Sequence, residues 1–233
     1  PNLSFEQFRD FHAKHYHPSN SRIFFAGDDD VYKRLEQMDE YLKEFDASED
    51  YKHKSEIHWQ KKKFTEPVRR TESYPVGPDQ PSKHMFTMNW LLNDKPFTPT
   101  EELTLGVLDH LMMGTTSSIL RKTLMESGLG EAITGGGLSD ELLQSTFSVG
   151  LKGVQPEKVA EAEQLILNTL TKIVEDGFTE DDIEASLNTI EFQMREFNTG
   201  SFPKYLSFNL AANTKWLYGR SPMSAVRFEK PLS

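Results

Sequence analysis

The chain has 233 residues, of which 36% are hydrophobic and 27% charged, and its formal net charge is −10. This composition is ordinary for a globular protein, and the length allows one large domain or one and a half ordinary ones. The absence of cysteine excludes disulfides, cysteine nucleophiles and thiolate zinc sites, and it favours a reducing compartment. No apolar run approaches the roughly 18–20 residues of a membrane helix, so we expect no membrane partner.

The negative charge argues against nucleic acid as a partner, because phosphates require a basic surface. It would suit a basic ligand or peptide, although an acidic surface is also ordinary for a soluble protein. The chain begins at Pro1 and reaches Ser233 without a closing element. We therefore expect an internal fragment of a longer protein.

The first part of the chain predicts a helix, a buried strand and a second helix, followed by a polar connection. Ser4 and Gln7 can form a capping box, and the proline after His17 stops the first helix. A short apolar run follows, and three aspartates then precede the next helix, where a helix N-terminus favours acidic groups. The expected ranges are 4–17, 21–26, 31–42 and, for the connection, 46–63.

The rest of the chain predicts pairs of strands followed by runs of helices. Thr98, Pro99 and Glu101 mark a strong helix start, and Gly114 and Gly177 are natural helix stops. The expected strands cover 67–76, 83–92, 131–139 and 143–153, and the expected helices cover 98–114, 118–127, 156–177, 179–197 and 202–218.

This order of elements predicts the α+β class, with a mostly antiparallel sheet and helices packed on one face. In the strand over 83–92, side chains alternate between the two faces of the sheet. The side chains expected on its core face are Phe86, Met88, Trp90 and Leu92.

Three histidines, His12, His15 and His17, lie close together on the first helix and superficially resemble zinc ligands. A hydrolytic zinc site needs three ligands, an open coordination position and usually a carboxylate base. No acidic residue stands among these histidines, and neither H-E-x-x-H nor H-x-x-E-H occurs in the chain. Packing and surface hydrogen bonding are the better interpretation.

Two further segments resemble ligand-binding motifs only in composition. Asp28, Asp29 and Asp30 could hold a hard cation, but a Ca²⁺ loop needs spaced ligands over about a dozen residues. Capping of the next helix explains them better. The glycine run 135–137 lacks the Lys-Ser/Thr ending of a P-loop and lies in strand-like sequence, which favours a β-bulge or a close backbone approach.

His110 lies beside Asp109 and shortly before Ser117 and Ser118, but no G-x-S-x-G surrounds a serine. We interpret it as a helix residue at a domain boundary. The lysines at 61–63 are too few for a nucleic-acid patch, and the sequon at Asn2 is fortuitous in an intracellular protein. The residues alone thus predict no catalytic and no metal-binding residue, and they leave the substrate-binding residues unknown.

Several long blocks of the sequence resemble a known family. The opening LSFEQFRDFHAKHYHPSNSRIFFAGDDD resembles the last helix and strand of the first domain in pitrilysin-type (inverzincin) metallopeptidases. Four later blocks resemble the organellar presequence proteases within that family, above all their plant and algal forms. These blocks are SKHMFTMNWLLNDKPF, LGVLDHLMMGTTSSILRKTLMESGLGEA, GLSDELLQSTFSVGLKGV and IEASLNTIEFQMREFNTGSFPKYLS.

The resemblance implies a large zinc metalloendopeptidase, folded as two halves around a closed chamber. Such an enzyme degrades short unfolded peptides, including cleaved targeting presequences, in the mitochondrial matrix or the chloroplast stroma. Residues 1–62 would end the first, catalytic-type domain and include a connection. Residues 63–233 would form most of the second, non-catalytic domain, truncated at its C-terminus.

Carried over residue by residue, the resemblance places no functional residue of the family in this chain. The zinc ligands come from an H-x-x-E-H helix and a later glutamate upstream of Pro1, and the substrate-gripping Arg and Tyr lie beyond Ser233. The fragment is therefore expected to bind no zinc, to be inactive alone, and to form part of the chamber wall.

The implied partners are unfolded peptides, above all basic ones that suit the chain's acidity, and the remaining domains of the same polypeptide. One alternative is a structural or binding protein of the same fold without peptidase activity, of the processing-peptidase or respiratory core-subunit type. A second alternative is another enzyme of the superfamily, such as an insulin-degrading type.

Overall fold

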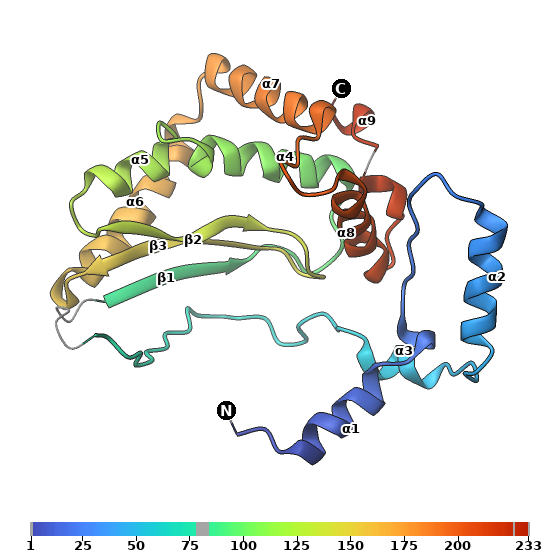
Figure 1. Cartoon of the computed structure of the whole chain (residues 1–233). Helices are drawn as coiled ribbons and strands as arrows, with labels where there is room; N and C mark the ends of the chain where they lie inside the picture. Colours follow the sequence, from blue (N-terminus) through green and yellow to red (C-terminus); the bar gives the residue numbers. More distant parts are fainter. Residues whose placement is uncertain (1, 78–83, 226, 233) are drawn as a thin grey trace. The chain divides into compact units, whose positions relative to one another are not determined.

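The computed structural model describes residues 2–77, 84–225 and 227–232 (Figure 1). The chain forms two compact units. Unit 1 comprises Pro1–His58 and Thr199–Ala225, and unit 2 comprises Trp59–Asn198 and Val226–Ser233. The domain boundary at residue 62 stays a prediction, because compact units of this chain need not be the domains of a longer polypeptide.

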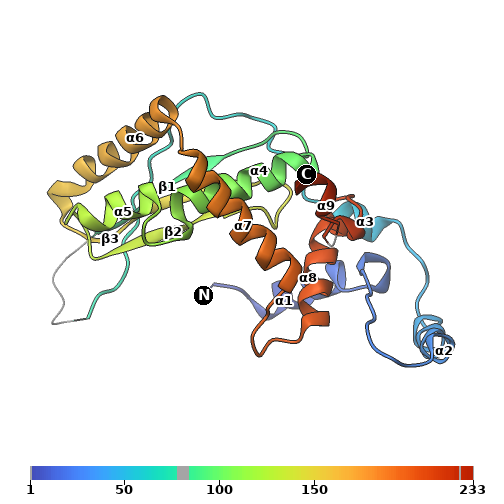
Figure 2. The ribbon, with the colours of Figure 1, turned by 90° about the horizontal axis from the view of Figure 1, so that it is seen from above.

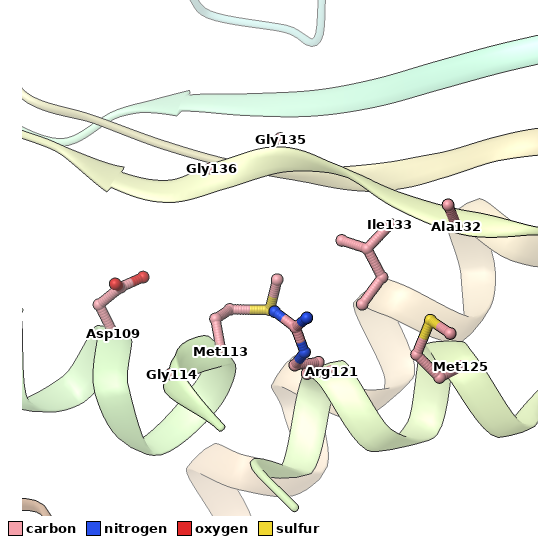
Figure 3. A pocket seen from close by; sticks show the side chains of 9 residues that line it. All are labelled: Asp109, Met113, Gly114, Arg121, Met125, Ala132, Ile133, Gly135 and Gly136. Carbon is pink, nitrogen blue, oxygen red and sulfur yellow. The ribbon is translucent and has the colours of Figure 1, made fainter. Parts of the chain in front are cut away.

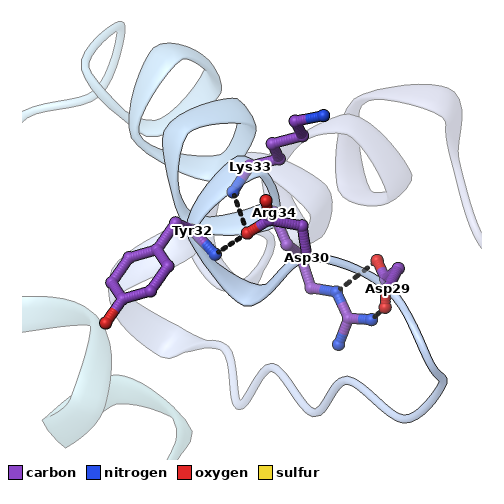
Figure 4. A network of polar contacts seen from close by, with 5 residues as sticks. All are labelled: Asp29, Asp30, Tyr32, Lys33 and Arg34. Atoms are coloured by element: carbon purple, nitrogen blue, oxygen red, sulfur yellow. Dashed lines mark hydrogen bonds and ion pairs between the residues drawn. The ribbon is translucent and has the colours of Figure 1, made fainter.

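Unit 1 is helical in its described residues. Ser4 and Gln7 form the predicted capping box at the start of the first helix. Asp30 caps the second helix, as the sequence predicts, by accepting the amides of Tyr32 and Lys33 (Figure 4). The α-helices of the unit are α1 (Phe5–His15), α2 (Val31–Leu42), α3 (Asp50–Ser55) and α8 (Lys204–Leu217), and short 3₁₀ turns cover Pro18–Asn20 and Pro222–Ala225.

One prediction for unit 1 is wrong. Residues 21–26 are not a strand, because the described part of this unit offers no other strand with which they could pair. Ile23, Phe24 and Phe25 accordingly remain between 41% and 44% exposed. The polar connection predicted over 46–63 contains the short helix α3.

Unit 2 contains a three-stranded antiparallel sheet in its described residues, with the order β1-β3-β2. The helices α4, α5 and α6 lie on one face of this sheet (Figure 1), and α7 crosses over α4 when seen from above (Figure 2). The α+β prediction is confirmed. The strands are β1 (His84–Leu91), β2 (Ala132–Ser139) and β3 (Thr146–Val154), and the helices are α4 (Pro99–Asp109), α5 (Ile119–Glu126), α6 (Val159–Asp176), α7 (Glu180–Glu196) and α9 (Glu229–Leu232).

Residues 67–76, predicted as a strand, have no regular structure, and the whole segment is exposed. The expected partner strand at 83–92 pairs with β3 instead, from His84 onward, while residue 83 lies outside the described residues. No helix in the described part of either unit combines the length and apolarity that crossing a membrane requires.

The core of unit 2 lies between the sheet and the helices that cover it. Leu120 and Leu124 of α5 are fully buried, as are Val149 of β3 and Ile166 of α6. The predicted core-face residues of β1 pack against this cluster, and the ring centroids of Trp90 and Phe147 are 5.9 Å apart. The sequence therefore predicts correctly which side chains of this segment face the core.

Gly150, in the middle of β3, allows the two outer strands to meet. A Cβ atom at this position would lie 2.0 Å from the carbonyl oxygen of Phe86 in β1. From the other side, the hydroxyl of Thr134 in β2 donates a hydrogen bond of 2.8 Å to the same carbonyl. β1 and β2 are thus joined across a central residue that has no side chain.

We expect Gly150→Ala to lower the free energy of unfolding by about 1–3 kcal/mol, because the added methyl would displace the backbone of β1. The matched control is Gly136→Ala, where a Cβ would meet nothing within 4 Å. The control should change stability by less than about 0.5 kcal/mol. Urea unfolding followed by circular dichroism measures both, and equal effects would contradict the close approach at Gly150.

Candidate functional site

A hollow of about 480 Å³ opens in unit 2 between the end of α4, the helix α5 and the strand β2 (Figure 3). Its apolar lining includes two methionines and an isoleucine, and its charged groups are one carboxylate and one guanidinium. The lining residues are Asp109, Met113, Gly114, Arg121, Met125, Ala132, Ile133, Gly135 and Gly136.

The helical wall of the hollow owes its shape to a π-helical turn over His110–Gly114 that continues α4. A Cβ atom at Gly114 would lie 2.5 Å from the imidazole of His110, so glycine lets the turn close over this ring. The hydroxyl of Ser118 donates to the carbonyl oxygen of His110 at 2.9 Å and accepts from the amide of Thr115 at 3.0 Å. These bonds satisfy backbone groups that the end of a helix would otherwise leave unpaired.

The strand wall is the glycine run of β2, which forms the predicted bulge. The pairing with β3 shifts register between Thr134 and Gly137. Gly135 and Gly137 have φ angles of 79° and 69°, a region that residues with a side chain rarely adopt. A Cβ atom at Gly137 would lie 2.2 Å from the Oδ1 atom of Asp109, so glycine is also needed for the approach of α4.

Asp109 connects the two walls. Its Oδ1 atom accepts a hydrogen bond of 2.9 Å from the amide of Leu138. Burial raises the pKa of this carboxyl group above its ordinary value, while the Leu138 amide and then the charge of His110 act in the opposite direction. The carboxylate is thus held against the sheet at a cost in solvation.

Arg121 faces the same hollow from α5 (Figure 3). Within the described part of the chain, its guanidinium makes no ion pair and no hydrogen bond. The hollow therefore presents the positively charged guanidinium of Arg121 and apolar side chains. Its carboxylate, Asp109, is already hydrogen-bonded to the backbone of β2. Such a surface can bind a side chain, but it presents no nucleophile with a base beside it.

His110 points away from this carboxylate, towards α7. Its Nδ1 atom lies 3.0 Å from the Oγ atom of Ser186, which is only 5% exposed. A serine so buried cannot reach a substrate, and Asp109 bonds to Leu138 rather than to the imidazole. The arrangement lacks the orienting acid and the access of a hydrolytic triad. His110 lies within unit 2. Its interpretation as a residue at a domain boundary stays a prediction.

The histidines at the start of the chain each have a separate partner. His12 stacks on Tyr16, with ring centroids 4.7 Å apart. The Nδ1 atom of His15 lies 3.0 Å from the Oγ atom of Ser55. His17 accepts from the amide of Ser19 at 3.2 Å and stacks on Tyr51. Among the described residues no three His, Cys, Asp or Glu side chains gather in a way that could hold a metal ion.

The other candidates have local structural contacts. Asp29 forms an ion pair with Arg34 (Figure 4). The guanidinium of Arg34 also lies 4.8 Å from the ring centroid of Phe25. Lys63 pairs with Asp94 on an exposed surface. The absence of catalytic and metal-binding residues, predicted from the sequence, stays a prediction.

Residues 2–190 match the family model described as the Peptidase M16 inactive domain. The chain therefore belongs to the M16 peptidase family, through its inactive domain. Presequence protease 1, chloroplastic/mitochondrial, of Arabidopsis thaliana is 53% identical over 234 residues, which cover all of this chain and 22% of that protein.

Two more distant relatives also match the whole chain. Protein HypA of Clostridium perfringens is 36% identical, and 24% of its length is covered. The mitochondrial presequence protease of Danio rerio is 31% identical, and 22% of its length is covered. The chain thus spans less than a quarter of the length of these curated relatives.

The pKa shift of Asp109 predicts a pH dependence of stability. Its folded pKa lies above the unfolded value of about 3.9, so the folded state binds the proton more tightly. Ionisation of Asp109 therefore lowers the free energy of unfolding. This loss of stability is absent below the unfolded pKa and grows as the pH rises through the folded pKa. We expect the stability of Asp109→Asn, relative to wild type, to increase from pH 4 to pH 7.

Urea unfolding at several pH values measures this difference. Asp109→Ala is the control, because alanine cannot accept the Leu138 amide. It should be less stable than Asp109→Asn at every pH, by about 1–3 kcal/mol. A relative stability of Asp109→Asn that falls towards pH 7 would show that the ionised carboxylate stabilises the fold.

Proposed function

We propose that this chain is a non-catalytic segment of a zinc metalloendopeptidase that degrades short unfolded peptides, such as cleaved organellar targeting presequences. The observation that carries the proposal is the match of residues 2–190 to the inactive domain of M16 peptidases. The 53% identity along the whole chain to a chloroplastic/mitochondrial presequence protease supports the substrate class. It equally supports a location in the mitochondrial matrix, the chloroplast stroma or both.

In this proposal the chain supplies wall and scaffold for a peptide chamber. Residues 1–62 end the catalytic-type domain, and residues 63–233 form most of the inactive one. Zinc, bound by residues outside the chain, supplies Lewis-acid chemistry to the parent enzyme. The residues of this chain hold the sheet and the helices of the wall in place. The hollow beside Arg121 is the part best suited to contact a peptide side chain.

The whole parent protein should cleave an unfolded presequence peptide, and a chelator should abolish the cleavage. The 233-residue chain alone should show no cleavage above background, because the serine that His110 contacts is buried and no triad is formed. Fluorogenic peptide hydrolysis measures both. Chelator-sensitive cleavage by the chain alone would refute the non-catalytic assignment. An inactive parent would favour a structural or binding protein of the same fold.

The acidity of the chain favours basic peptides in this proposal. The net charge is −10, and exposed carboxylates such as Glu126, Glu175 and Glu184 contribute to it. A negative surface potential raises the local concentration of positively charged substrates, and salt screens this attraction. Presequences rich in arginine would therefore be attracted.

Neutralising these three residues to glutamine in the parent should weaken the binding of an Arg-rich peptide by about tenfold at low salt, and by less at high salt. Binding of an uncharged peptide of equal length should not change. The matched control neutralises the exposed Lys122 and Lys172, which should not weaken the binding of the basic peptide. Unchanged affinity of the glutamine variant for the Arg-rich peptide would refute the charge argument.

A further inference from the structure

Arg121 is a half-buried cation without a carboxylate partner in the wall of the hollow. It projects from α5 and lies between Met113 and Met125 (Figure 3). Within the residues that the structure describes, no acidic side chain pairs with its guanidinium, whereas Arg69 and Arg195 each form an ion pair. A guanidinium that is partly removed from water gains strongly from an anionic ligand, because charge-assisted hydrogen bonds are the strong ones.

Asp109 supplies the carboxylate of the lining, but it does not pair with Arg121. It lies at one end of the hollow, and its Oδ1 atom accepts the Leu138 amide at 2.9 Å (Figure 3). The missing side chain of Gly137 is what lets this carboxylate approach the strand. Because Asp109 is held at the sheet, the hollow beside Arg121 is available to a carboxylate that comes from another molecule.

The apolar part of the lining suits a side chain of variable shape. Met113, Met125 and Ile133 lie beside the guanidinium, and Met125 is 53% exposed. Methionine is unbranched and flexible, and it is common on surfaces that accept many partners. The volume of about 480 Å³ lies within the range of about 300–1,000 Å³ that is usual for ligand pockets. The chemistry of the hollow therefore fits a carboxylate joined to an apolar group.

Targeting peptides are rich in arginine and serine and poor in acidic residues. Such a peptide still carries one carboxylate, at its C-terminus. We propose that the hollow binds the C-terminal residue of a peptide, with the terminal carboxylate on the Arg121 guanidinium and the last side chain on the methionines. This inference rests on the proposed function. The basic remainder of the peptide is attracted by the net charge of −10 of the chain.

Binding of an Arg-rich peptide to the whole parent protein tests this inference, with a chelator present so that the peptide is not cleaved. Two versions of the peptide differ only at the C-terminus, which is a free carboxylate or a neutral amide. Fluorescence anisotropy should show that the free acid binds at least about tenfold more tightly. Arg121→Gln should remove this difference. Arg121→Lys should keep part of it, because lysine keeps the charge but loses the fork of donors.

The matched control is Lys122→Gln, which removes an exposed neighbouring cation outside the hollow and should leave the ratio of the two affinities unchanged. Met125→Glu is a second variant, at a position that is 53% exposed and so tolerates a charged group. It places a carboxylate four residues after Arg121 on α5, where the two side chains can pair. This variant should reduce the preference for the free acid.

Equal affinity of the wild type for the two peptides, or a preference that survives Arg121→Gln, would overturn the inference. Equally tight binding of an amidated peptide that ends in glutamate would also overturn it, because the hollow would then recognise an acidic side chain. Cleavage without chelator tests the proposed function separately. A parent that cleaves both peptides but binds them equally refutes this inference alone. A parent that prefers the free acid but cleaves neither peptide refutes the peptidase proposal alone.

Discussion

The hydrogen bond from the Leu138 amide to the Asp109 carboxylate joins the helical layer of unit 2 to its sheet. The bond is possible because Gly137 has no side chain, since a Cβ there would collide with Asp109 Oδ1 at 2.2 Å. The same bulge in β2 forms one wall of the hollow, and the π-helical turn after Asp109 forms the other. One half-buried carboxylate, costly to desolvate, thus helps to set the shape of the region.

Features with a local cause could be predicted from the sequence. The Thr98–Glu101 capping box, the alternation along β1 and the bulge at the glycine run all depend on residues a few positions apart. The apolar run 21–26 has the composition of a strand, but a strand exists only through a partner, and the described part of unit 1 supplies none. The bond between Thr134 and Phe86 across Gly150 likewise depends on a distant pairing.

The contact between His110 and Ser186 could not be predicted from the sequence alone. His110 and Ser186 are 76 residues apart, and only the packing of α7 on α4 brings them within 3.0 Å. In this chain the contact packs the π-helical turn against α7, since Ser186 is only 5% exposed.

Anomalous diffraction at the zinc absorption edge, on crystals of the whole parent protein, tests this account most directly. It locates the metal without relying on activity or on variants. The account predicts a zinc peak whose protein ligands all lie outside residues 1–233, and no peak near His110, Asp109 or Ser186. A zinc ion ligated by His110, or by any other residue of this chain, would contradict it.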